Sequence, residues 1–497
     1  MVPLHEVADR IFSSPPPMWF VALLAVNVVW LAWTVRVAYL TRLRSVPGPF
    51  LAKFTRLWIV SKVAQGQSHH FYRKLHAKYG PVVRIAPDKV ILADVVAASS
   101  LYSVGTQFYK SDYYKAFGIE MAQSPLPDMP NPTILNLFST RDLDYHRRVK
   151  SAIAPAYAIA SLKQMEPFVD TCAELFVEQM RKRSGEVIDI GSWLQYYAFD
   201  VIGMITFSKP FDYLDSGTDA LALIEPLHGG IIYASIVGQI PWLHRFLLGN
   251  TYLQTFLTRY TPMGKASPLV PIRKKKAMNE RLNEQQVVDT LFMNVLAGSD
   301  TTAITLRAVL YMLIKHPEAY KKLQAEIDEY EAAGKFAKSA VPFDVGKQMP
   351  YLKAAIKESM RIHPGVPMPL ERLVPAGGME VLGYHLPTRT AVGVAPSVIN
   401  YNKEIFGGDA ASFRPDRWVH CSPQQLSAMD RYFFSFGAGP RLCIGKNIAL
   451  LEMTKLVPQL LRHFDIEWAS DHPEWQISGY WFAKPKDMFV KMIPRNK

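Results

Sequence analysis

Cysteine is scarce in this sequence of 497 residues, which holds only Cys172, Cys421 and Cys443. Three cysteines do not make a disulfide framework, so the chain is no disulfide-stapled secreted scaffold and suits a reducing compartment. The sequence also lacks the cysteine and histidine spacing of zinc fingers and the aromatic signature of RNA-binding modules. Its glycine clusters lack the strand–turn–helix setting of a flavin or nicotinamide site. These absences disfavour nucleic-acid binding and a resident dinucleotide cofactor.

One apolar run is long enough to cross a bilayer. It extends over residues 18–40 and is interrupted only by Asn27, Thr34 and Arg36. Basic residues follow it and acidic residues precede it, so the positive-inside rule places the rest of the chain in the cytosol. A cleaved signal peptide is the alternative, but the run is long for one and its flank is acidic. The sequence predicts a membrane anchor in residues 1–44 and a catalytic domain in residues 45–497.

The overall composition is that of a globular protein, with 49% hydrophobic and 20% charged residues, which excludes wholesale disorder. Lys and Arg number 56 against 43 Asp and Glu, giving a net charge of +13. Such an excess suits an anionic membrane surface or an acidic protein partner.

Shorter patterns predict the remaining elements. Residues 71–79 and a segment that opens at Asp142 have helical patterns, and residues 187–214 form an apolar-rich helix. Residues 82–85 and 90–93 read as short strands. Residues 105–140 are rich in proline and look irregular, and a loop of that length is usually functional.

A single cysteine lies in the glycine-rich run from Phe436 to Gly445, two residues after Arg441. Glycine lets the backbone approach a large flat group and adopt positive φ without strain. Nearby N–H groups and the N-terminus of a following helix both favour a thiolate at Cys443. Arg441 adds a cation that can hold a carboxylate through two hydrogen bonds. A buried structural cysteine is the plainer alternative.

Residues 286–316 read as one long helix with an unusual centre, Ala297-Gly298-Ser299-Asp300-Thr301-Thr302. Glycine costs a helix about 1 kcal/mol relative to alanine, and Ser, Asp and Thr compete for its backbone hydrogen bonds. We expect a local opening there that admits water or a diatomic ligand. The adjacent carboxyl and hydroxyl of Asp300 and Thr301 can relay protons. A kink without chemistry is the alternative.

These two motifs resemble those of the cytochrome P-450 family of haem-thiolate monooxygenases. The family signature Phe-x-x-Gly-x-Arg-x-Cys-x-Gly is complete, and so is the motif Ala/Gly-Gly-x-Asp/Glu-Thr-Thr/Ser. The resemblance covers residues 45–497. It implies a mainly α fold with a smaller β-rich part, forming a single haem domain behind the transmembrane helix.

The resemblance also implies the roles of individual residues. Cys443 is expected to be the axial ligand of haem iron, and Asp300 and Thr301 are expected to deliver protons during catalysis. The residues expected to bind haem are Cys443, Arg441, Arg372, His146, Lys150, Phe436, Gly445 and Ala297. Lys150 departs from the arginine that is common there, and Arg147 or Arg148 is an alternative to it. Glu358, Arg361 and Arg417 are expected to form a structural charge triad.

The activity implied is the insertion of one oxygen atom from O2 into an apolar small molecule, with haem b as cofactor and electrons derived from NADPH. The expected donor is NADPH-cytochrome P-450 reductase, with a cytochrome b-type protein as a further donor. The expected location is the endoplasmic reticulum membrane, with the catalytic domain facing the cytosol. Residues 76–87 and 194–203 resemble fungal members near the pisatin-demethylase-like group, which suggests secondary metabolism.

Two other classes remain open. One is a haem-thiolate isomerase or dehydratase that needs no reductase, and the other is a non-catalytic membrane haem-binding protein. Isomerases of this kind usually depart from the motif around Asp300, and a binding protein would not need Asp300 and Thr301. Both alternatives are therefore disfavoured.

Overall fold

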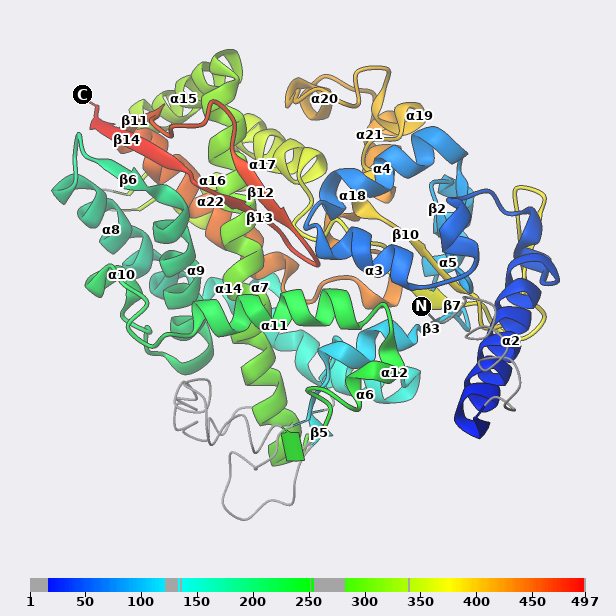
Figure 1. Ribbon diagram of the computed structural model, residues 1–497. Coiled ribbons are helices and arrows are strands. Elements are labelled where there is room, and N and C mark those ends of the chain that lie inside the picture. Colours follow the sequence, from blue (N-terminus) through cyan, green and yellow to red (C-terminus); the bar gives the residue numbers. More distant parts are fainter. Residues whose placement is uncertain are drawn as a thin grey trace, which may run out of the picture.

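The computed structural model describes residues 17–120, 133–134, 136–250, 252–253, 282–337 and 340–495. Residues 1–16 and part of the predicted loop at 105–140 lie outside these ranges. About 59% of the described residues are helical, and the strands form small sheets. The expected mainly α fold with a smaller β-rich part is therefore confirmed (Figure 1).

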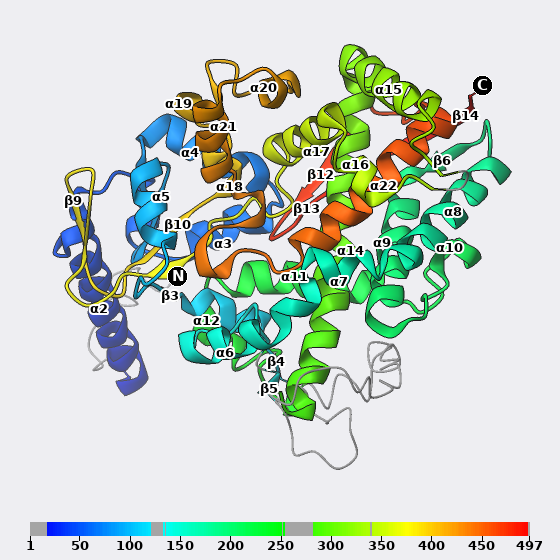
Figure 2. The same ribbon diagram turned by 180° about the vertical axis from the view of Figure 1, so that it is seen from behind.

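The long helices form the larger part of the molecule. Helix α14 (Glu284–Lys315) runs through its centre, with α9 (Ile190–Phe207) packed along it (Figures 1 and 2). Around this pair lie α8 (Glu166–Lys182), α15 (Pro317–Ala332), α17 (Pro350–Ile362) and α22 (Lys446–His463). Their apolar faces form one continuous core, which includes Phe176, Tyr197 and Leu306.

The other described helical segments include one long helix, α2, and many shorter ones. They are α2 (Met18–Tyr39), η1 (Arg42–Ser45), η2 (Phe50–Lys53), α3 (Leu57–Ala64), α4 (Ser68–Tyr79), α5 (Val95–Tyr102), η3 (Asp112–Phe117), α6 (Leu143–Ile153), η4 (Ala154–Tyr157), α7 (Ile159–Lys163), α10 (Tyr213–Ser216), α11 (Ile224–Val237), α12 (Pro241–His244), α16 (Phe343–Gly346), α18 (Pro396–Ile399), α19 (Lys403–Phe406), α20 (Asp416–Val419), α21 (Pro423–Arg431), η6 (Phe434–Phe436) and η7 (Gly439–Arg441).

The largest sheet has the order β1-β2-β10-β7-β3. Its strands are β1 (Val82–Ala86), β2 (Lys89–Leu92), β10 (Ala391–Val394), β7 (Arg372–Leu373) and β3 (Tyr109–Lys110). Only the β2–β10 pair within it is parallel. The register places Lys110 directly opposite Arg372. This pairing brings two cations together at the edge of the sheet.

The remaining strands form small antiparallel units. A three-stranded sheet has the order β11-β14-β6, and three hairpins pair β4 with β5, β8 with β9, and β12 with β13. Their bounds are β4 (Ile119–Glu120), β5 (Thr133–Ile134), β6 (Val187–Asp189), β8 (Met379–Val381), β9 (Tyr384–Leu386), β11 (Phe464–Trp468), β12 (Gln476–Gly479), β13 (Ala483–Lys486) and β14 (Phe489–Pro494).

Most predicted elements are present near their predicted bounds. The apolar run forms α2, which is the one described helix that is long and apolar enough to cross a membrane. The predicted strands at 82–85 and 90–93 are β1 and β2, and the helix after Asp142 is α6. The predicted helix at 187–214 is wrong at both ends, because residues 187–189 pair with β14 as strand β6 and α9 ends at Phe207.

Helix α14 differs from the prediction at its centre, where it is unbroken. An Asn283–Gln286 capping box begins it. The hydroxyl groups of Ser299 and Thr301 donate to the carbonyls four residues earlier, at 2.7 and 2.6 Å. These hydroxyls share the helix carbonyls with the backbone, so the motif fits within a continuous helix.

Candidate active site

The segment that carries Cys443 is a tight loop ahead of α22. The Cys443 N–H donates to the Phe436 carbonyl at 2.9 Å and closes the loop. Gly437 and Gly439 have φ angles of +73° and +64°, which glycine adopts without strain. The Cys443 side chain is exposed at the end of this loop. Its thiol is therefore accessible to a ligand.

Gly439 is needed for a second reason, which is close packing. A Cβ atom at this position would lie 1.7 Å from the carbonyl oxygen of Tyr102, at the end of α5. Only glycine fits there without moving the Cys443 loop or α5.

The surroundings of Cys443 act on its thiol in two directions. Water reaches the sulfur, yet protein surrounds most of it, and this burial raises the pKa of the thiol. The N–H groups of Gly445 and Lys446 and the ammonium of Lys150 oppose that shift. The helix N-terminus thus favours the thiolate, as predicted, but burial outweighs it. Coordination to a metal deprotonates a thiol outright.

Lys150 contacts the same loop from α6. Its Nζ donates to the carbonyls of Pro440 and Leu442 at 2.7 and 3.0 Å. The lysine expected to meet a haem propionate therefore also ties α6 to the loop that carries Cys443.

Arg441 extends from this loop into a cluster of basic groups. One of its guanidinium nitrogens, Nη2, is buried and has no hydrogen-bond acceptor in the described part of the chain. Burial and the charge of Arg372 lower the pKa of Arg441 to about 10. Burial, Arg441, Lys150, Lys110 and Arg372 lower the pKa of His146 to about 3. The structure thus brings Arg372, Arg441, His146 and Lys150 together.

Lys110 is a member of this cluster that the sequence analysis did not identify. It lies opposite Arg372 in the sheet, and its Nζ lies 3.9 Å from the centre of the Tyr114 ring. Burial, Arg372 and Arg441 lower its pKa well below the usual value. Buried cations this close repel one another unless an anion lies among them. The cluster therefore suits an anionic ligand.

The centre of α14 presents the second predicted group of residues. Ala297 is exposed although it lies midway along this central helix, and Thr301 is partly exposed one turn later. Asp300 is buried, and its Oδ1 accepts a hydrogen bond from Gln195 Nε2 on α9. Lys484 Nζ on β13 lies 3.9 Å from the same oxygen.

Gln195 is itself held in place by Arg307. The Arg307 guanidinium donates to Gln195 Oε1 at 3.1 Å and to the Gly191 carbonyl at 3.0 Å. Gln195 therefore bridges Arg307 and Asp300, and this bridge fixes the Asp300 carboxylate. The sequence analysis did not single out Gln195, because it lies among the apolar residues of a helix.

Tyr157 connects helix α14 to the segment that follows the Cys443 loop. Its hydroxyl donates to Asn294 Oδ1 on α14 at 2.5 Å. Its carbonyl accepts from Asn447 Nδ2, just after the Cys443 loop, at 3.0 Å. The two motifs that stand far apart in the sequence therefore meet through η4.

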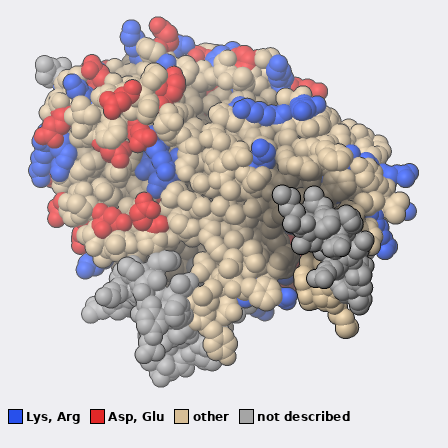
Figure 3. Space-filling view, viewed as in Figure 1, with Lys and Arg blue, Asp and Glu red and all other residues tan. Residues whose placement is uncertain are grey.

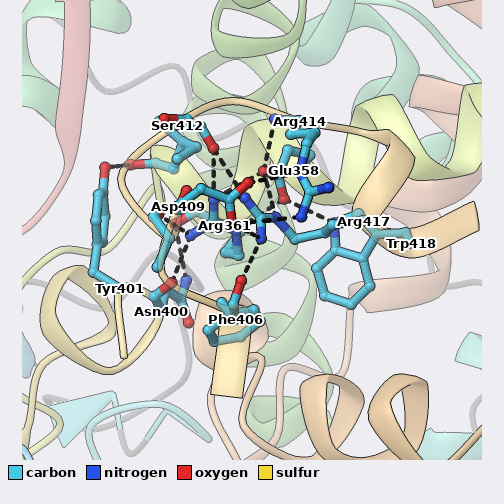
Figure 4. A network of polar contacts seen from close by, with 12 residues as sticks. Glu358, Arg361, Asn400, Tyr401, Phe406, Asp409, Ser412, Arg414, Arg417 and Trp418 are labelled. Carbon is cyan, nitrogen blue, oxygen red and sulfur yellow. Dashed lines mark hydrogen bonds and ion pairs between the residues drawn. The ribbon is translucent and has the colours of Figure 1, made fainter. Parts of the chain in front are cut away.

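The predicted charge triad is present and buried (Figure 4). Arg361 Nε and Nη2 donate to the two Glu358 oxygens at 2.8 Å each, and Arg417 Nε donates at 3.0 Å. Trp418 Nε1 adds a fourth hydrogen bond at 2.8 Å. Burial would raise the pKa of Glu358, but the two arginines outweigh it and hold that pKa below its usual value.

The triad is connected to the Cys443 loop through Asn400. Arg361 donates to the Asn400 carbonyl at 2.8 Å. The Asn400 side chain donates to Ser435 Oγ at 3.0 Å and accepts from the Phe434 N–H at 3.0 Å. The triad thus supports the turn that begins the loop.

Comparison with known families identifies the protein class. The family model described as Cytochrome P450 matches residues 47–252 and 266–492. The chain belongs to the cytochrome P450 family. It is similar to pisatin demethylase from Fusarium vanettenii, with 34% identity over 94% of this chain and 91% of that protein.

Two further relatives are cytochrome P450 monooxygenases. One is mpaDE from Penicillium roqueforti, at 34% identity over 93% of this chain and 57% of that protein. The other is cicH from Emericella nidulans, at 31% identity over 92% of this chain and 94% of that protein. The chain therefore spans little more than half of mpaDE.

This P450 is a haem-thiolate monooxygenase with haem b as its cofactor, and it uses O2 and electrons derived from NADPH. The residues present fit that group. The orphaned Nη2 of Arg441 and the surrounding cations suit its propionates, and the accessible Cys443 thiol suits its iron. When bound, haem supplies the activation of dioxygen.

The first prediction concerns the Cys443 loop. Gly439→Ala should greatly reduce haem content, because a strained φ alone costs about 1–3 kcal/mol and the new Cβ would also collide with Tyr102. The measurement is the Soret absorbance per mole of purified protein. Gly408→Ala is the matched control, because a Cβ there meets nothing within 4 Å. A full haem content in Gly439→Ala would contradict this account.

The second prediction concerns the triad. Glu358→Gln should lower the free energy of unfolding by about 3–5 kcal/mol, because it leaves two buried arginines without a counter-charge. Urea denaturation measures the loss. Glu178→Gln serves as the control, since its exposed pair with Lys182 should contribute less than about 1 kcal/mol. Equal losses in the two variants would show that the triad adds no special stability.

Proposed function

We propose that the protein oxidises an apolar small molecule in fungal secondary metabolism, using electrons from NADPH-cytochrome P-450 reductase at the endoplasmic reticulum membrane. The main support for a haem-dependent oxidation is the accessible Cys443 thiol. It lies on a loop that also places Arg441 in the basic cluster. Cys443 is the proposed axial ligand. Arg441, Arg372, His146 and Lys150 are proposed to bind the propionates, together with Lys110.

Phe436, Gly445 and Ala297 are proposed to contact the haem plane. Phe436 and Gly445 flank Cys443 in its loop, and Ala297 is exposed on α14. A small side chain at 297 allows a flat group to approach the helix closely. Asp300 and Thr301 are proposed to deliver protons, with Asp300 oriented by Gln195 and Lys484.

A cluster of aromatic side chains supports the proposal of an apolar substrate. Trp481, at the tip of the β12–β13 hairpin, lies 5.7 Å from Tyr113 and 5.1 Å from Phe117 between ring centres. Tyr114 belongs to this cluster and also lies beside Arg372 and Arg441. The rings of Trp481, Tyr113 and Tyr114 are buried, so they form an apolar support behind the proposed propionate site, and the proposed substrate would meet the apolar surface that this core holds in place. Pisatin demethylase, a relative, is named for its action on pisatin.

Helix α2 supports membrane attachment. It is apolar, 22 residues long and almost entirely exposed. Lys, Arg, Asp and Glu side chains crowd the part of the surface that carries α8, α10 and β6, but are sparse over α11 (Figure 3). A single-pass anchor with the catalytic domain in the cytosol is consistent with the arginines that follow α2.

The third prediction tests ligation by Cys443. The reduced protein should show a red-shifted, thiolate-type Soret band with carbon monoxide, and Cys443→Ala should abolish it because no other ligand replaces the sulfur. Cys421→Ala is the control, since Cys421 lies outside the loop. Haem-loaded wild-type protein without this band would refute thiolate ligation.

The fourth prediction tests the role of Thr301. In the reconstituted system, Thr301→Ala should lower product formed per NADPH about tenfold or more, with the lost electrons appearing as peroxide, because proton delivery fails. Thr301→Ser should keep most of the coupling. Thr305→Ala is the matched control, because Thr305 makes the same kind of backbone hydrogen bond one turn later. Equal uncoupling in Thr301→Ala and Thr305→Ala would exclude a specific proton relay at Thr301.

A further inference from the structure

Arg84 is a fully buried arginine at the junction between α2 and the rest of the protein. Its backbone belongs to β1, and its side chain has 0% relative exposure. Sequence patterns assign this residue only to a short strand. The guanidinium has five N–H donors, and where they point decides what the residue does.

Three of the hydrogen bonds of Arg84 go to the anchor segment. Nη2 donates to the Val37 carbonyl at 3.0 Å, and Nη1 donates to the carbonyls of Ala38 and Leu43 at 3.2 and 3.3 Å. Its other side-chain hydrogen bonds go to the carbonyls of Ala86 and Pro87, which lie two and three residues later in the chain. The guanidinium therefore joins β1 to the last turn of α2.

The chemistry of this contact is that of a helix C-terminal cap. The last four carbonyls of a helix lack partners within the helix and carry a partial negative charge. Val37 and Ala38 belong to the last turn of α2, which ends at Tyr39. A buried cation satisfies these carbonyls and complements their charge at the same time. Burial lowers the pKa of Arg84, and nearby Asp88 opposes this shift.

The segment after α2 is also attached to the haem domain. The Arg84 N–H donates to the Pro47 carbonyl at 2.7 Å. A Cβ on Gly48 would lie 2.1 Å from the Arg84 carbonyl oxygen, so this glycine rests directly on β1. Arg42 contacts His385 at 2.9 Å. Residues 46–49 are therefore seated on the domain and do not form a free hinge.

We propose that Arg84 locks the angle between the membrane anchor and the haem domain, so that the domain has one orientation on the lipid surface. This inference rests on the proposed membrane attachment of α2. The lock holds Phe50 and Leu51, which follow the anchor and are 65% and 58% exposed, in a fixed position beside α2. Apolar side chains placed there suit contact with lipid.

The test uses the full-length protein in vesicles of phosphatidylcholine and phosphatidylserine. Trypsin can cut after Arg42 and Arg44, whose side chains are exposed, but only when the junction opens locally. Arg84→Lys keeps the charge but has three donors in place of five, on one nitrogen in place of a planar fork, so it cannot bond to all of these carbonyls. It should therefore release the haem domain from the vesicles about tenfold faster or more, because cleavage follows the population of the open junction.

Arg56→Lys is the matched control, because among the described residues the Arg56 side chain bonds only to Gln239 and Asp88, both in the haem domain. Its release rate should equal that of the wild type. Equal release from Arg84→Lys and the wild type would overturn the lock. Wild-type protein that does not sediment with vesicles would instead refute membrane attachment, and the lock with it.

A second variant covers the case in which Arg84→Lys does not fold. A Gly-Ser insertion between Ser45 and Val46 leaves every Arg84 contact with the anchor in place. Linear dichroism of the Soret band in aligned bilayers then reports the orientation of the domain. Dichroism like that of the wild type would support the lock, whereas its loss would show that the linker sets the angle and would overturn the proposal.

Discussion

Electrostatic repulsion among buried cations is the constraint on which the active site depends. Lys110 and Arg372 face each other across two paired strands, and like charges in that position destabilise a sheet. Arg441 brings a third cation and a guanidinium nitrogen without an acceptor among the described residues. The two propionates of haem, which we propose to bind in this cluster, would resolve this repulsion. The stability of this region is therefore coupled to cofactor binding, whereas the helical core around α14 is held together by apolar contacts.

In the triad of Glu358, Arg361 and Arg417, the protein itself supplies the carboxylate that balances the buried cations. There the buried arginines have a carboxylate between them, and every Glu358 oxygen accepts hydrogen bonds. The two sites are joined through Asn400 and the turn at Phe434–Phe436. A preformed scaffold on one side of the Cys443 loop thus supports a ligand-dependent cluster on the other. The hydrogen bonds through Asn400 hold the turn that precedes Cys443 without any contribution from the basic cluster.

The sequence predicted the parts of the site that lie in local motifs. The Cys443 loop, the centre of α14 and the apolar anchor each have a pattern within a few residues, and the family match confirms the class. Lys110 and Gln195 could not be predicted in the same way. Lys110 lies in a two-residue strand whose partner is more than 250 residues away in the sequence. The role of Gln195 is visible only from its hydrogen bond to Asp300, which no sequence pattern indicates. The expected opening of α14 is absent, since the helix is continuous through residues 297–302 and the Ser299 and Thr301 hydroxyls bond to its own carbonyls.

The internal cations also change how the net charge of +13 should be interpreted. An excess of this size suggests a basic outer surface for a membrane or an acidic partner. Yet several basic residues are buried, namely Arg84, Arg307, Arg372 and Lys110. Most of the N–H groups of Arg84 and Arg307 donate to backbone carbonyls. Part of the excess therefore serves to cap a helix, to fix Asp300 and to receive an anionic cofactor. The described chain buries eight basic and six acidic side chains, so the excess left on the surface for partners is only about two charges smaller than the composition implies.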